Sequence, residues 1–286
     1  MRRSAVLLVP ALLLLACSDD GGDGPDSPLA DAAADTSTDA PPAQIIDAGV
    51  PPLDSSTPAI DARAADASTS DAALREVPCV DEQFARLMLF EAPSTGPVRE
   101  EGTTAGEFVT FIDAAAGGLM TNQSFTYARF TASGLQKVEI GDEVAFSSLD
   151  WDIAFRRYVF RTNGGVGGPG DVRVGRTAAG TTFAGLSAIP ADLPYRSEAY
   201  YTESCEYVAD VGIGAPVTAL SSFWSYTSCL QMTHNVYVLA LQSGRHVKLE
   251  VLSYYPPDNQ KRCDDTGAIT QPSGAGNLRV RWAFVD

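Results

Sequence analysis

The chain has 286 residues, and its 36 acidic and 20 basic side chains give a formal net charge of −16 at pH 7. Because this charge repels phosphate groups, it argues against nucleic-acid binding as a function. The chain has only two histidines and lacks Gly-x-Ser-x-Gly, His-Glu-x-x-His and phosphate-loop motifs. We therefore expect a binding protein and not an enzyme.

The first residues have the pattern of a secretory signal. Arg2 and Arg3 precede an apolar run over residues 5–16, which is too short to span a bilayer as a mature helix. The run ends in Leu-Leu-Ala-Cys, a bacterial lipobox pattern, at Cys17. We expect removal of residues 1–16 and acylation of Cys17, which would anchor the protein in a lipid bilayer. Ser18 favours sorting to the outer membrane. A signal peptide cleaved elsewhere, with Cys17 incidental, is the alternative.

Residues 17–76 are predicted to be a disordered linker. From Ser18 to Glu76 the chain has thirteen acidic and two basic residues among Ala, Pro, Ser and Thr. Such a segment cannot bury enough apolar surface to offset its ordering entropy, and its like charges extend it. It contains no spaced set of calcium ligands. Residues 77–286 then form the folded domain, with a net charge of about −7.

The predicted domain shows short apolar and alternating runs separated by Gly, Asn and Ser, with little helical periodicity. This pattern predicts an all-β fold, an antiparallel sheet or sandwich-like domain with long loops. The Gly-rich stretch Val166–Gly180 is expected to be a mobile loop, and residues 185–205 an irregular crossover. The expected strands are Phe108–Ile112, Phe125–Phe130, Gln136–Ile140, Trp151–Arg161, Val236–Leu241, His246–Tyr255 and Asn277–Phe284.

One hairpin can be given a register. A two-residue turn at Ser243-Gly244 would pair Leu241 with His246. The register then gives one face that is entirely apolar, which supports it. That face would hold Val236, Val238, Ala240, Val247, Leu249 and Val251, and the opposite face would be mixed.

Four cysteines remain in the domain, and an even set in an exported protein predicts two disulfides. The chain contains no Cys-x-x-Cys pair, so a zinc site is not expected. Cys229 and Cys263 lie just beyond the open ends of the predicted hairpin, which favours pairing them and leaves Cys79 with Cys205. The sequence alone allows three pairings.

The stretch Trp151–Gly165, which ends in Thr-Asn-Gly-Gly, resembles the signature of the HmuY-like family, haem-binding lipoproteins of Gram-negative cell envelopes. Tyr127–Gly134, Val236–Tyr255 and Leu278–Phe284 resemble further segments of that family in the same order, so the resemblance covers residues 105–286. It implies an all-β domain that holds haem at one end for iron acquisition. An outer-membrane transporter or another envelope protein would be a further partner.

The resemblance also implies axial iron ligands, paired His or in some members Met. In the predicted register His234 and His246 lie roughly 23 Å apart at about 3.3 Å per residue, so they cannot form a bis-His site. The cofactor-binding candidates are His234, Met232 and Tyr226. Met232 and His234 alternate and could point the same way, but only one would ligate the iron. Tyr226 could supply a second ligand or stack on the ring.

Each candidate has a structural alternative. His234 could be a surface-loop histidine, and His246 an exposed residue of the sheet. Of the carboxylates Asp150 and Asp152, one is expected to cap the preceding turn and the other to pair with Arg156 or Arg157. These two arginines and Arg161 could bind haem propionates, and solvent-facing ion pairs are the default expectation for them. The alternative function is a β interaction module that binds an envelope protein or glycan without haem.

Overall fold

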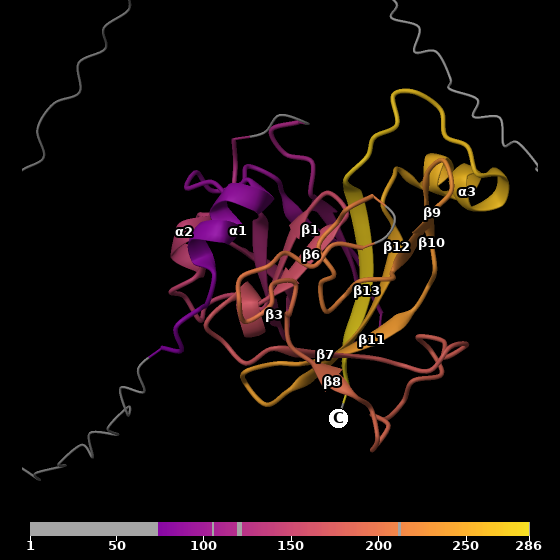
Figure 1. The fold of residues 1–286 in the computed structure, drawn as a ribbon. Helices are drawn as coiled ribbons and strands as arrows, with labels where there is room; N and C mark the ends of the chain where they lie inside the picture. The colour runs from indigo at the N-terminus through magenta and orange to yellow at the C-terminus, as the bar shows by residue number, and fades with distance from the viewer. Residues whose placement is uncertain (1–73, 105, 119–121, 211–212, 286) are drawn as a thin grey trace, which may run out of the picture. The chain divides into compact units, whose positions relative to one another are not determined.

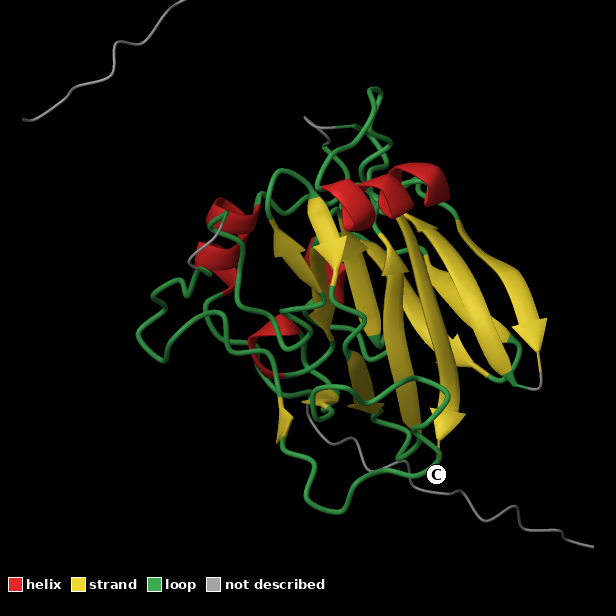
Figure 2. Cartoon of the chain, turned by 90° about the vertical axis from the view of Figure 1, so that its right-hand side faces the viewer, coloured by secondary structure: helices red, strands yellow, loops and turns green. Residues whose placement is uncertain are grey.

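The structure is a computed structural model that describes residues 74–104, 106–118, 122–210 and 213–285. It confirms the all-β, antiparallel fold (Figures 1 and 2). Cys17 and the predicted signal and linker, 1–16 and 17–76, lie outside the described residues except for 74–76. None of the helices in the described part of the chain is long and apolar enough to cross a membrane.

The alternation near the end of the chain produces the interior strand β13 (Asn277–Val285), in which Leu278, Val280 and Trp282 are fully buried. This strand belongs to a 7-stranded sheet with the order β1-β2-β13-β12-β11-β7-β8. The other members are β1 (Val98–Thr104), β2 (Glu107–Asp113), β12 (His246–Ser253), β11 (Val236–Ala240), β7 (Arg173–Arg176) and β8 (Tyr195–Arg196).

A second, 4-stranded sheet has the order β4-β3-β5-β6, and a 2-stranded ribbon pairs β10 with β9. The bounds are β3 (Thr126–Thr131), β4 (Gly134–Val138), β5 (Ile153–Arg156), β6 (Val159–Thr162), β9 (Trp224–Tyr226) and β10 (Leu230–Met232). The helices are α1 (Val80–Leu87), α2 (Asp142–Ala145), the 3₁₀ turn η1 (Gly165–Gly167) and α3 (Pro257–Thr266).

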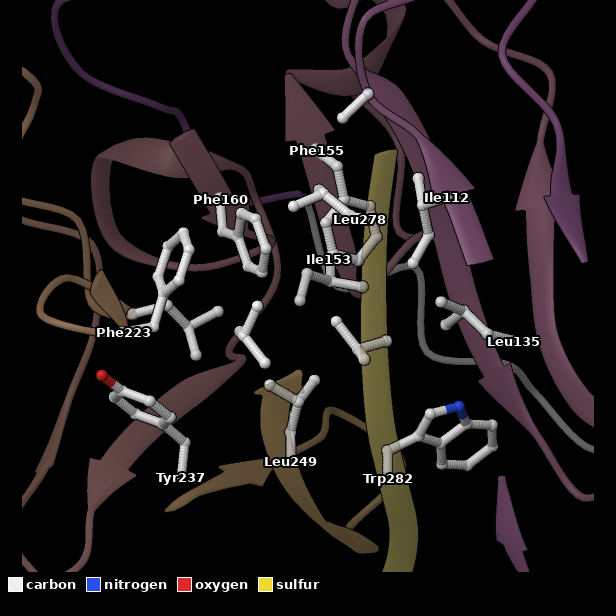
Figure 3. Close-up of a cluster of buried hydrophobic side chains, with 14 of the residues drawn as sticks. Ile112, Leu135, Ile153, Phe155, Phe160, Phe223, Tyr237, Leu249, Leu278 and Trp282 are labelled. Atoms are coloured by element: carbon white, nitrogen blue, oxygen red, sulfur yellow. The ribbon is translucent and has the colours of Figure 1, made fainter. Parts of the chain in front are cut away.

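The main core contains apolar side chains from both large sheets (Figure 3). Trp282 of the 7-stranded sheet stacks on Phe108 and meets Phe130 of the 4-stranded sheet edge-on. Its indole N–H donates to Thr110 Oγ1 at 2.8 Å, so its polar atom is satisfied inside the core. Burial of apolar side chains such as these stabilises the packing of the two sheets.

The outer face of the 7-stranded sheet is also covered around β11. Val236 and Val238 pack against Phe183 and Leu186 from the segment before β8. Lys248 Nζ donates to the carbonyl oxygens of both Phe183 and Leu186, at 3.1 and 3.2 Å. Strand β11 is therefore buried on both faces.

The predicted hairpin register is wrong by one residue. Ala240, and not Leu241, pairs with His246, because the loop has three residues, 242–244, and Gly244 takes the left-handed conformation at φ 80°. The one-residue shift exchanges the faces of β12 relative to β11. The apolar faces now join Tyr237 and Leu239 with Val247 and Leu249, while Val238 lies opposite Lys248.

Two other expectations need correction. The segment predicted as one strand, Trp151–Arg161, is the hairpin of β5 and β6, with Arg157 in its turn at φ 51°. The predicted loop Val166–Gly180 is largely buried and contains η1 and β7. Gly164 allows the chain to pack closely here, because a side chain at this position would collide with the carbonyl oxygen of Val172.

The disulfides join Cys79 to Cys205 and Cys229 to Cys263, the pairing favoured from the sequence. The first ties the start of α1 to the segment before the isolated bridge at Tyr207. The second ties the β9–β10 ribbon to α3, and Figure 1 shows these elements beside one another. The ribbon, which leads into β11, is thus held by a covalent link.

Candidate functional site

His234 lies between the β9–β10 ribbon and β11, in a left-handed backbone conformation with φ 53°. Its Nδ1 lies 2.9 Å from Oε1 of Glu250 on β12. The side chain of His234 is 53% exposed, whereas that of Glu250 is 7% exposed. Nδ1 is therefore held by Glu250, whereas Nε2 has no hydrogen-bond partner among the described residues.

The carboxylate of Glu250 also binds a guanidinium. Arg281 on β13 places Nη2 2.5 Å from Oε2 of Glu250, so each carboxylate oxygen has one partner. The hydrogen bond that His234 donates to Glu250 raises the pKa of His234 above its ordinary value. Burial by itself would raise the pKa of Glu250, but the hydrogen bonds from His234 and Arg281 lower it overall. The three side chains therefore link the segment before β11 to β12 and β13.

Met232 and Tyr226 lie in different environments from His234. Met232 is 8% exposed and belongs to the main core, whereas Tyr226 on β9 is 54% exposed. The backbone N–H of Met232 donates to Asp264 Oδ1 at 2.9 Å. The expectation that Met232 and His234 point the same way is wrong, because the left-handed conformation of His234 interrupts the strand alternation.

His246 is remote from His234. It pairs with Ala240 on β11 and with Val285 on β13. Six residues of chain separate Ala240 from His234, which corresponds to roughly 20 Å at about 3.3 Å per residue. The corrected register therefore still excludes a bis-His site from this pair.

The arginines after the signature strand have structural partners. Arg161 is fully buried; its Nη2 donates to the Gly167 carbonyl at 3.0 Å, and its Nη1 lies 3.9 Å from Asp142. Arg156 donates to the Met88 carbonyl at 2.8 Å and lies over the ring of Phe125. The expectation of solvent-facing ion pairs is wrong for Arg161 and Arg156, since both pair with the buried carboxylate of Asp142.

The two aspartates of the signature also differ from expectation. Asp152 Oδ2 accepts the backbone N–H of Phe130 at 2.9 Å, and burial raises the pKa of Asp152. Asp150 is exposed and lies 3.7 Å from Arg129. Neither carboxylate has Arg156 or Arg157 as its ion-pair partner among the described residues.

Glu198 was missed by the sequence analysis. It is 2% exposed and accepts three hydrogen bonds, two from Thr162 and one from the Ala219 N–H. Burial raises its pKa to about 7. Glu198 is a single acidic residue in an irregular, tyrosine-rich segment, so no hydrophobic periodicity predicts its burial. Only its contacts in the structure show that it is buried.

One further cluster has the composition of a metal site, with Cys79, Glu82 and Cys205 close together. The two sulfur atoms are joined in a disulfide, so neither is available as a thiolate ligand. The cluster therefore does not fit a metal.

The sequence model of the HmuY protein family matches residues 110–266, more than half of the chain. The chain belongs to the HmuY family. The matched region of this HmuY-family chain contains His234, Met232 and Glu250 but ends before β13, which supplies Arg281. No curated protein matches the chain.

Solved structures with a similar arrangement come from three bacteria. A putative lipoprotein of Bacteroides fragilis is 14% identical, with a TM-score of 0.41 over 64% of this chain and 94% of that chain. A putative HmuY-like haem-binding protein of Bacteroides vulgatus is 16% identical, with a TM-score of 0.40 over 68% and 97%. An apo HmuY analogue of Tannerella forsythia is 15% identical, with a TM-score of 0.34 over 68% and 98%.

Proposed function

We propose that this HmuY-family protein binds haem or a related porphyrin for iron acquisition, with Nε2 of His234 as an axial ligand. Metal-ligating histidines commonly donate their other ring N–H to a carboxylate, which fixes the tautomer and raises the basicity of the ligand. The Nδ1–Oε1 contact of 2.9 Å between His234 and Glu250 is that arrangement, and it carries the proposal.

Iron in haem accepts a neutral imidazole nitrogen. When Nδ1–H of His234 donates to Glu250, the lone pair of the neutral ring lies on Nε2. The partial exposure of the ring leaves room for a macrocycle to approach it. Tyr226, exposed on the neighbouring ribbon, is the proposed stacking residue, while Met232 would have to leave the core before it could ligate.

The remaining parts of the proposal concern location. Acylated Cys17 would hold the protein on a lipid bilayer of a Gram-negative cell envelope, in our proposal the outer membrane. The acidic linker would let the β domain move away from the membrane surface. An outer-membrane transporter or another envelope protein would then receive the haem.

Titration of the purified protein with haemin tests the proposal. We expect a shifted and sharpened Soret band in the wild-type protein, and loss of that band in His234→Ala. His246→Ala is the matched control and should leave the band unchanged, because His246 lies at the far end of the hairpin. A wild-type protein that gives no Soret shift would favour the interaction module instead.

A further inference from the structure

A cavity of about 340 Å³ lies between helix α3 and the ends of strands β12 and β13. Figure 1 shows these three elements at the same end of the molecule. Ser253 and Arg279 are paired residues of β12 and β13, and both line the cavity. The remaining lining residues are Leu252, Pro257, Gln260, Lys261, Asp264 and Asp265.

Two polar groups of this cavity are buried without a hydrogen-bond partner among the described residues. They are the hydroxyl of Ser253, a residue that is only 5% exposed, and Nη1 of Arg279. The other guanidinium nitrogens of Arg279 are held by Glu101, with Nε at 2.7 Å and Nη2 at 3.2 Å. Glu101 therefore fixes the guanidinium and leaves Nη1, which carries two N–H donors, for a ligand.

The acids of the cavity do not neutralise these donors. Asp264 Oδ1 accepts hydrogen bonds from the Met232 N–H and from Gln260 Nε2. Asp265 is paired with Lys261 at 2.5 Å. The unused hydrogen-bonding capacity is thus a guanidinium N–H beside a hydroxyl, a pair that suits a carboxylate. Leu252 and Pro257 add apolar surface for the body of such a ligand.

The cavity adjoins the proposed iron ligand. Arg279 and Arg281 are two residues apart on β13, in a regular register with β2, so their side chains share the outer face of the sheet. Arg281 binds Glu250, which holds His234. Two residues of a strand span roughly 7 Å. Arg279 therefore lies about that far along β13 from Arg281, the partner of Glu250.

We infer that the cavity lined by Ser253 and Arg279 binds a carboxylate of the porphyrin that His234 holds. The inference rests on the proposed function and adds the recognition of the ligand's acid groups. A haem carries its two propionates at the ring edge, away from the iron, so their binding groups must lie beside the axial ligand. Arg279 and Ser253 occupy that place relative to His234.

The experiment compares haemin with haemin dimethyl ester, whose carboxylates are blocked, in titrations of the full chain. We expect the ester to bind more weakly by roughly tenfold to a hundredfold, as for loss of hydrogen bonds to a charged group. Arg279→Ala and Ser253→Ala should weaken haemin binding and leave ester binding unchanged. Arg173→Ala is the control, since Arg173 is an exposed arginine on β7, three strands away from β13 in the same sheet.

The Soret maximum separates this subsite from the axial ligand. Arg279→Ala and Ser253→Ala should keep the wild-type maximum at saturation, whereas His234→Ala should not. Ser253→Ala removes one hydroxyl and tests the subsite even if loss of Arg279 prevents folding. Equal binding of haemin and its ester overturns the subsite alone. Carboxylate-dependent binding of metal-free protoporphyrin IX supports the subsite even if His234 proves not to ligate iron; no binding of either porphyrin overturns both.

Discussion

The backbone N–H and the hydroxyl of Thr162 both donate to the buried carboxylate of Glu198, at 3.0 and 2.9 Å. This contact joins the end of β6 to the crossover that follows β8. The Thr-Asn-Gly-Gly signature therefore has a structural role: Thr162 binds Glu198, and Asn163 donates to the Trp151 carbonyl at 2.9 Å. These contacts hold β6, the Trp151 backbone and the crossover together.

Gly165→Ala should destabilise the protein more than Gly244→Ala. Both glycines have positive φ, 58° and 80°, so both substitutions strain the backbone by about 1–2 kcal/mol. At Gly165 a Cβ would also collide with the carbonyl oxygen of Glu198, whereas nothing lies within 4 Å at Gly244. Urea unfolding of both variants gives the free energies of unfolding. Equal losses of unfolding free energy in the two variants would show that the close contact between Gly165 and the Glu198 carbonyl does not contribute to stability.

The stability of the protein should fall as pH rises from about 4.5 to 7. Burial raises the pKa of Glu198 from an ordinary 4.5 to about 7, so the folded state binds its proton more tightly than the unfolded state. This contribution to the free energy of unfolding is fully present below pH 4.5 and is lost as the pH rises through 7; it is on the order of 3–4 kcal/mol. Unfolding at a series of pH values measures it. Glu198→Gln should flatten this slope, and Glu203→Gln, at an exposed position, should keep it.

The two disulfides should differ in their effect on ligand binding. Their loops span 126 and 34 residues, and loss of either should cost about 2–5 kcal/mol of unfolding free energy. Cys229→Ser/Cys263→Ser frees the ribbon that leads to His234, so it should also weaken haemin binding. Cys79→Ser/Cys205→Ser should lower the melting temperature and leave binding unchanged. Identical haemin affinities of the two double variants would argue against a site at His234.

Haemin binding should weaken at low pH. The hydrogen bond to Glu250 raises the pKa of His234, and iron must displace the proton when the ring is charged. Glu250→Gln removes the charge that raises this pKa, so the midpoint of a Soret-monitored pH titration should move to lower pH. The affinity at neutral pH should fall roughly tenfold to a hundredfold, as for other partners of metal-ligating histidines. Glu107→Gln, which alters a carboxylate near Lys248, should leave both quantities unchanged.

Much of the fold follows from local patterns in the chain. The alternation of Leu278, Val280 and Trp282 predicts β13, and the turn residues predict an antiparallel arrangement. The cysteines beyond the ends of one hairpin predict the Cys229–Cys263 link even though the assumed register is wrong. These features follow from the two-residue alternation of a strand and from the closeness of the two ends of a hairpin. Both depend on residues that are near in the sequence.

Only the tertiary structure decides the register and the candidate site. Val236 and Val238 are buried on one face of β11, and Tyr237 and Leu239 on the other, so an apolar pattern fits two registers equally well. The three-residue loop ending at Gly244 selects one of them. His234 is visible in the sequence, but its partner Glu250 comes from another strand, and Arg279 and Ser253 meet through pairing of β12 with β13. Sequence periodicity assigns side chains to faces, whereas the packing of strands and helix α3 decides which of them meet.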